Sequence, residues 1–203
     1  MGGRIPIRLD NLLSVAKCEA LVACADACAE DVGGWAPGAA GGTKHRRYAT
    51  TDVSMERVEA RGDASYREAL CETVIPAIAA VWRLDPRRLG VSEAFVVKYS
   101  ASGQNSLDLH TDSSRFSLNV LLSHEGDFDG GGTWFETLGR AERLRQGGAL
   151  IHEGDLKHRG MPISSGARYI LVAFIEYDTT TSLRRPRRLD VRHDRPSPEP
   201  PSS

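Results

Sequence analysis

The second half of the chain is a series of short β-rich runs separated by glycine-rich turns, and this pattern constrains the fold more than any other feature. The runs cover residues 94–99, 116–122, 148–152 and 169–175, with glycines at 130–132 and 147–148 between them. Short strands with glycine turns are typical of β-sandwiches and jelly rolls. Since a single core usually serves a chain of 203 residues, we expect one domain.

The N-terminal part has a different, mainly helical pattern. Residues 5–9 alternate and predict an edge strand, because Pro6 has no N–H to donate. Asp10 is predicted to cap a first helix. The segments that follow are a glycine-rich loop at 33–42, a strand at 47–53 and a second helix at 64–82 that Pro76 disturbs. Helices followed by strands predict an α+β fold in which N-terminal helices support a sandwich or jelly roll.

Composition and charge exclude several classes of protein. Hydrophobic residues make up 40% of the chain and charged residues 26%, which excludes wholesale disorder. The longest nearly apolar run, residues 74–82, is too short to span a membrane. The net charge of −1 gives no reason to expect a nucleic-acid or membrane partner.

The net positive charge is concentrated at the C-terminus. Residues 183–203 hold six arginines and three acidic residues, a balance of +3, so the preceding 182 residues carry −4. Because this segment is also rich in proline and serine, we expect residues 179–203 to be a disordered basic tail, with docking to an acidic partner as the alternative. The N-terminus lacks a signal-peptide pattern and no cysteines have CxxC spacing, which predicts a cytoplasmic location.

Two histidines and one aspartate form a candidate metal centre. His110 and Asp112 lie two residues apart, and on an extended segment this spacing directs both side chains to the same face. His158 is the best candidate for a third ligand. Two histidines and one carboxylate form the facial triad of non-haem Fe(II) oxygenases, which leaves coordination positions open. An HxD pair also arises often by chance, so the neighbouring residues must show whether these three side chains form a metal centre.

Arg168 supplies that context. It follows His158 by ten residues and begins the last strong strand. Burying an arginine there is costly unless an anion pairs with it, and the guanidinium can hold a carboxylate through two hydrogen bonds. The order His-x-Asp, distal His, Arg therefore predicts a metal site beside a carboxylate anchor.

These residues lie in four motifs that resemble the Fe(II)/2-oxoglutarate-dependent dioxygenases of the prolyl 4-hydroxylase type, with the closest likeness to the procollagen lysyl hydroxylase catalytic domain. The motifs are residues 95–99 (FVVKY), 109–120 (LHTDSSRFSLNV), 127–132 (DFDGGG) and 158–170 (HRGMPISSGARYI). The resemblance implies a double-stranded β-helix, or jelly roll, with a catalytic core at residues 93–178. Residues 1–92 would then be the supporting region of the same domain.

The resemblance also implies roles for individual residues. His110, Asp112 and His158 match the iron ligands, and Arg168 matches the residue that binds the distal carboxylate of 2-oxoglutarate. Tyr99 matches a tyrosine that faces the iron pocket. Asn119 should point into the barrel if its neighbours at 117 and 121 do, either to contact 2-oxoglutarate or to make a structural hydrogen bond. His152 has two open interpretations, a structural residue of the barrel wall or a pocket-lining residue.

The expected activity is hydroxylation of an unactivated C–H bond with Fe(II), 2-oxoglutarate and O₂, releasing succinate and CO₂, with ascorbate as a possible reductant. The expected substrate is an amino acid or a peptidyl lysine or proline. The alternatives are hydroxylation of a small-molecule metabolite and a non-catalytic metal-binding jelly roll. Asp108, Asp127 and Asp129 are candidates to receive a substrate ammonium group, or else solvated loop carboxylates.

Overall fold

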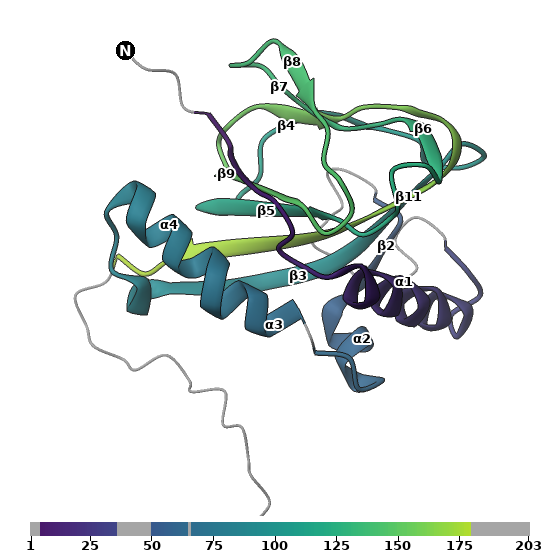
Figure 1. The fold of residues 1–203 in the computed structure, drawn as a ribbon, viewed down its shortest axis with the longest axis horizontal. Helices are drawn as coiled ribbons and strands as arrows, with labels where there is room; N and C mark the ends of the chain where they lie inside the picture. The colour runs from purple at the N-terminus through teal and green to yellow at the C-terminus, as the bar shows by residue number, and fades with distance from the viewer. Residues whose placement is uncertain (1–4, 36–49, 65, 180–203) are drawn as a thin grey trace, which may run out of the picture.

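Two antiparallel sheets face each other, and helices cover the outer face of the larger one (Figure 1). The computed structural model describes residues 5–35, 50–64 and 66–179. The larger sheet has the strand order β1-β9-β5-β11-β3-β2, with β6 paired to one end of β11. The smaller sheet has the order β4-β10-β7-β8. This is the predicted α+β jelly roll, so the fold class is confirmed.

The strands of the larger sheet are β1 (Ile7–Leu9), β2 (Asp52–Ser54), β3 (Leu89–Ser100), β5 (Phe116–Leu121), β6 (Phe128–Gly130), β9 (Ala149–Glu153) and β11 (Ile163–Tyr177). Those of the smaller sheet are β4 (Leu107–His110), β7 (Thr133–Phe135), β8 (Arg140–Glu142) and β10 (His158–Gly160). The helices are α1 (Val15–Glu30), α2 (Met55–Ala60), α3 (Tyr66–Ala69), the π-helical η2 (Leu70–Val74), α4 (Ile75–Trp82) and the 3₁₀-helical η3 (Pro86–Arg88). None of the described helices is long and apolar enough to cross a membrane.

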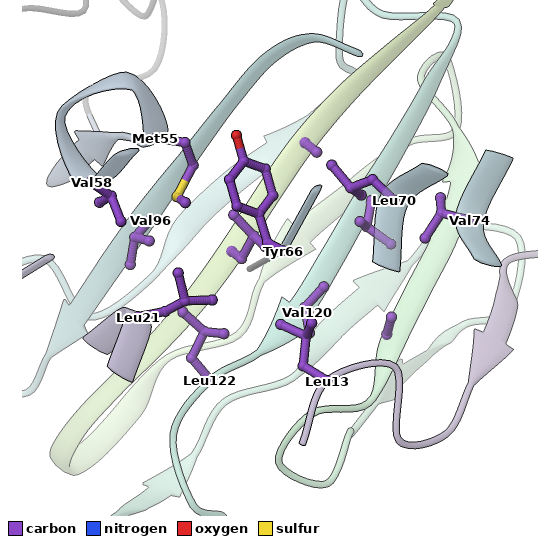
Figure 2. Close-up of a cluster of buried hydrophobic side chains, with 14 of the residues drawn as sticks. Leu13, Leu21, Met55, Val58, Tyr66, Leu70, Val74, Val96, Val120 and Leu122 are labelled. Atoms are coloured by element: carbon purple, nitrogen blue, oxygen red, sulfur yellow. The ribbon is translucent and has the colours of Figure 1, made fainter. Parts of the chain in front are cut away.

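Alternation along the strands of the larger sheet separates two cores. On β5, Leu118 and Val120 face the helices, whereas Leu121 packs in the core between the sheets. On β3, Val96 joins the helix side and Val97 the inner side. Figure 2 shows the helix-side core, where side chains of the helical segments meet those of the sheet. Since successive side chains of a strand point to opposite faces, each central strand contributes to both layers.

The N-terminal elements differ in detail from the sequence prediction. Helix α1 begins at Val15 with Ser14 as its cap, because the Ser14 side chain accepts a hydrogen bond from Lys17 N at 3.3 Å. The cap predicted at Asp10 is therefore wrong. The predicted strand at 5–9 is present as β1, at the edge of the sheet.

The helix predicted at residues 64–82 is divided into α3, the π-helical η2 and α4. Pro76 lies in the first turn of α4, where its missing N–H removes a hydrogen bond from the ladder and its ring excludes the normal α-helical contact with the preceding turn. The predicted disturbance thus takes the form of a π-helical turn. Residues 36–49, which include most of the predicted loop and the start of the predicted strand at 47–53, lie outside the described residues, as does the tail from 180 onwards.

Gly166 lies at the bend of β11, where a side chain has no room. Its φ is +72°, and a Cβ atom there would lie 1.9 Å from the carbonyl oxygen of Asp127. Gly139 has a similar φ of +63° but open space around it. We expect Gly166→Ala to lower the free energy of unfolding by more than about 2 kcal/mol, because backbone strain and a backbone clash add together. Gly139→Ala, which has the strain alone, should cost about 1 kcal/mol. Urea unfolding followed by circular dichroism measures both variants, and equal losses would contradict the steric argument.

Candidate active site

The smaller sheet brings the two histidines of the candidate metal centre together. His110 ends β4 and His158 begins β10, and the two residues are directly paired in the β4–β10 ladder. Asp112 follows in the loop after β4. One potential ligand atom from each of the three residues lies within 4.8 Å of the other two. The structure thus assembles the three side chains that the sequence pattern singled out.

Hydrogen bonds to the backbone determine the tautomer of both histidines. The His110 Nδ1 atom lies 2.7 Å from the carbonyl oxygen of Asp108, and the His158 Nδ1 atom lies 2.8 Å from that of Leu156. A carbonyl oxygen only accepts, so each Nδ1 must be the protonated donor. Each Nε2 atom therefore carries the lone pair that can bind a metal, and the two Nε2 atoms lie 3.5 Å and 3.6 Å from the two carboxylate oxygens of Asp112.

Asp112 is held in place and in its ionised form. The Ser117 hydroxyl donates a hydrogen bond to Asp112 Oδ2 at 2.5 Å. Burial by itself would raise the pKa of the Asp112 carboxyl, but His110, His158 and the Ser117 hydroxyl outweigh it and lower this pKa to about 2. The sequence contains no separate signal for Ser117 beyond its alternation with Asn119 on β5. Its role as a donor to Asp112 is visible only in the structure.

The pKa values of the two histidines shift in opposite directions, although burial lowers both. Burial lowers the pKa of His158 to about 3, and the neighbouring His152 acts in the same direction. For His110, burial is outweighed by the bonds to Asp112 and the Asp108 carbonyl, so its pKa is raised. His158 is therefore neutral at all ordinary pH values, whereas His110 takes up a proton more readily than a free imidazole.

The triad lines a cavity of about 70 Å³ between the two sheets, and Arg168 lies in the same cavity. Arg168 is only 4% exposed, and its guanidinium lies 5.4 Å from the centre of the Tyr99 ring. Burial lowers the pKa of this guanidinium, and no carboxylate in the described part of the chain forms an ion pair with it. Tyr99 and Asn119 line the cavity as well. A buried cation without an anionic partner is a ready binding site for a carboxylate ligand.

The remaining wall of the cavity is largely apolar. Its apolar residues come from β3, β4 and β11 and are Phe95, Val97, Leu107, Ile170, Val172 and Phe174. Thr50, Thr133 and Gly160 complete the lining. An apolar wall around a metal site excludes water from the reacting atoms.

His152 lies behind the metal centre and does not line the cavity. It is fully buried, with its ring centre 4.4 Å from that of His158 and 5.2 Å from that of Phe135. Of the two interpretations left open by the sequence, the structure thus places His152 in the barrel wall. The aspartates proposed for a substrate ammonium are not in the cavity either: Asp108 and Asp127 are exposed, and Asp129 lines a second cavity of about 240 Å³. The sequence left these residues open as receptors of a substrate ammonium group or as solvated carboxylates, and no contact in the structure decides between the two.

This donor set fits a divalent first-row metal. Two neutral imidazoles and one carboxylate on one side leave the opposite side open, as in the 2-His-1-carboxylate sites of non-haem Fe(II) oxygenases. The unpaired Arg168 in the same cavity fits the far carboxylate of a dicarboxylic 2-oxoacid.

Comparison with known proteins agrees with this geometry. The human multifunctional procollagen lysine hydroxylase and glycosyltransferase LH3 is 34% identical over 175 residues, which is 81% of this chain and 23% of the human protein. The chain therefore spans less than a quarter of the length of this curated relative. No family model matches the chain.

Two solved structures share the fold. The viral collagen prolyl hydroxylase of Paramecium bursaria Chlorella virus-1 has a TM-score of 0.61 and 17% identity, covering 85% of this chain and 96% of the viral chain. A Pseudomonas putida prolyl-4-hydroxylase has a TM-score of 0.59 and 14% identity, covering 86% of this chain and 94% of that chain. The chain belongs to the 2-oxoglutarate–Fe(II) oxygenases. It is related to the procollagen lysyl hydroxylase catalytic domain and has the fold of the prolyl hydroxylases.

Metal affinity should depend on pH through His110. Its raised pKa means that, as the pH falls, the proton adds first to the Nε2 lone pair that faces the metal. Below that pKa the metal must displace about one proton, so the logarithm of the association constant should fall by about one for each pH unit. His158 should contribute nothing above about pH 4, since its pKa is about 3.

Calorimetric titration with Mn(II) between pH 5.5 and 8 measures this dependence. The exposed His124, whose ring accepts a bond from Gly126 N, provides the matched control. His124→Gln should leave the pH dependence unchanged. A metal affinity that is constant over this pH range would contradict the assignment of His110 as the titrating ligand. A dependence that corresponds to the displacement of two protons for each metal ion would contradict it as well.

Proposed function

We propose that this protein is a 2-oxoglutarate-dependent hydroxylase that uses Fe(II) and O₂ to hydroxylate an amino-acid or peptidyl side chain. The observation that carries the proposal is the placement of a 2-His-1-carboxylate triad and an unpaired buried arginine in one cavity. The triad suits Fe(II), and the arginine suits the distal carboxylate of 2-oxoglutarate.

Each residue of the cavity has a distinct task in this proposal. His110, Asp112 and His158 hold the metal. When bound there, Fe(II) supplies the activation of O₂ that is coupled to oxidative decarboxylation of 2-oxoglutarate to succinate and CO₂. Arg168 binds and orients 2-oxoglutarate through its distal carboxylate, while Tyr99 and Asn119 form the wall beside it. The apolar residues exclude water, and ascorbate serves as the external reductant.

A lysine side chain is the first substrate to test. The support is the relationship to a protein named as a procollagen lysine hydroxylase, together with the apolar wall, which fits the methylene stem of lysine. Phe95 and Phe174 form part of this wall, with ring centres 5.5 Å apart in an edge-to-face arrangement. Proline is the second substrate to test, since solved structures with the same fold are named as prolyl hydroxylases. The cytoplasmic location stays a prediction.

The activity is tested by succinate release from 2-oxoglutarate with Fe(II) and ascorbate. Asp112→Ala should abolish turnover and weaken Fe(II) binding, because two imidazoles alone leave the dication without a compensating charge. Asp10→Asn, which removes an exposed carboxylate that does not line the cavity, is the matched control and should remain active. Lysine peptides, free lysine, proline peptides and free proline are compared by succinate yield and by the mass of one added oxygen.

The outcomes separate the parts of the proposal. If Asp112→Ala turned over at the rate of the wild type, the assignment of Asp112 as a metal ligand would be contradicted. Stimulation by an unrelated metabolite, with none of the four amino-acid substrates active, would contradict the substrate and leave the oxygenase activity standing.

Arg168 is expected to determine the affinity for 2-oxoglutarate. Arg168→Ala should raise the KM for 2-oxoglutarate more than tenfold, since loss of a buried charge pair costs about 2–5 kcal/mol. Arg168→Lys should recover only part of this loss, because a point charge cannot replace the two-pronged guanidinium. Iron binding should be nearly unchanged in both variants. An unchanged KM in Arg168→Ala would show that another cation binds the cosubstrate.

A further inference from the structure

Four side chains form a closed cluster on the helix-facing side of β3 and β11, which we call the back-face clamp: Asp26, Trp35, Lys98 and Tyr169. Asp26 of α1 is its centre, because it accepts hydrogen bonds from Trp35 Nε1 at 2.7 Å and from the Tyr169 hydroxyl at 2.8 Å. The Lys98 ammonium lies 3.4 Å from the same carboxylate oxygen. One carboxylate thus joins helix α1 to both strands.

The aromatic rings of the clamp also hold Lys98. Its ammonium nitrogen lies 4.9 Å from the centre of the Tyr169 ring and 5.2 Å from that of Trp35. The two rings meet edge to face, with centres 5.7 Å apart. These are favourable cation–π and aromatic contacts. The Lys98 and Asp26 side chains are partly buried, and Tyr169 is buried.

The clamp lies next to the residues that line the cavity, but on the opposite face. In the β3–β11 ladder Arg168 pairs with Tyr99, and the adjacent pair is Tyr169 with Lys98. Because neighbouring residues on a strand point to opposite faces, the first pair faces the cavity and the second faces the helices. Each residue of the cavity pair is therefore bonded through the backbone to a residue of the clamp.

These two pairs lie near the end of the β3–β11 ladder. The β3–β11 pairing starts at Ala167 and Ser100, only one position before Arg168 and Tyr99. On the other side of Ala167, Gly166 has a φ of +72° and β11 turns to pair with β6. Ends of ladders open more easily than their centres, so side-chain anchoring at this position adds to the order of the pair.

We propose that the back-face clamp is a positioning device for the 2-oxoglutarate carboxylate. Asp26 and Tyr169 act through the strand backbone and hold Arg168 and Tyr99 in the geometry that binds the cosubstrate. This inference rests on the proposed function, in which Arg168 binds 2-oxoglutarate. Its physical basis is preorganisation, since an anchor that is already ordered loses less entropy when the ligand binds.

Two variants test the clamp. Tyr169→Phe keeps the ring and its contact with Lys98 but removes the hydroxyl that donates to Asp26, and Asp26→Asn removes the charge that pairs with Lys98. Each should weaken binding of N-oxalylglycine, an unreactive analogue of 2-oxoglutarate, by about three- to tenfold in calorimetric titrations of the Mn(II)-loaded protein. The KM for 2-oxoglutarate should rise by a similar factor, whereas kcat at saturation and Mn(II) affinity should stay unchanged.

Tyr66→Phe is the matched control. Tyr66 is also buried on the helix side, and its hydroxyl donates to Glu59, a carboxylate that in turn pairs with Arg67 at 2.7 Å. It is carried by α3 rather than by either strand of the ladder end. We expect this variant to lose stability to a similar extent as Tyr169→Phe, with its affinity for N-oxalylglycine unchanged.

The outcomes distinguish this inference from the proposed function. If the wild type binds N-oxalylglycine and both clamp variants bind it equally well, the inference is overturned and the proposed function stands. Equal weakening in Tyr66→Phe would also overturn it, because the effect would then be general destabilisation. A wild type that neither binds N-oxalylglycine nor forms succinate would overturn the proposed function, and the inference with it.

Discussion

The antiparallel ladder between β3 and β11, which runs from the Ala167–Ser100 pair to the Tyr177–Leu89 pair, supports both halves of the molecule. One of its faces packs against the helices through residues such as Val96 and Leu171, and the other contributes Phe95, Val97 and Val172 to the inner core. Two strands buried on both faces need no supporting metal to stay together. The cavity can therefore contain groups that weaken a core, because the scaffold around it is stabilised independently.

Burying those polar and charged groups lowers the stability of the fold. The triad is largely buried, and Arg168, which is 4% exposed, forms no ion pair with a carboxylate of the described chain. Desolvation of charged side chains destabilises a fold unless a ligand or an opposite charge compensates for it. The helix-facing side of the same strands shows the contrasting case, in which the Asp26 carboxylate accepts hydrogen bonds from Trp35 and Tyr169. The face of β11 that carries a buried cation without a carboxylate partner is thus the face that is equipped to bind an anionic ligand.

The longer strands were predictable from the sequence, and most of the shorter ones were not. The β-rich runs at 94–99 and 169–175 lie within β3 and β11, because a strand buried on both faces leaves a nearly continuous apolar run. The three- and four-residue strands β4, β7, β8 and β10 are too short to show a period. The π-helical turn before Pro76 also has no sequence signature of its own. Tertiary packing determines which backbone hydrogen bonds form around a proline.

For the site, the sequence by itself determined the chemistry. The order His110-x-Asp112, His158, Arg168 specifies the donor types, and the alternation of β5 places Asn119 toward the cavity. Only the tertiary structure decided the geometry: the β4–β10 pairing sets His110 opposite His158, Ser117 donates to Asp112, and Asp26 reaches Tyr169 from a distant helix. The physical reason is that residue types and local spacing are carried by the chain itself. Distances between segments far apart in sequence depend on strand register and on the lengths of the loops that connect them.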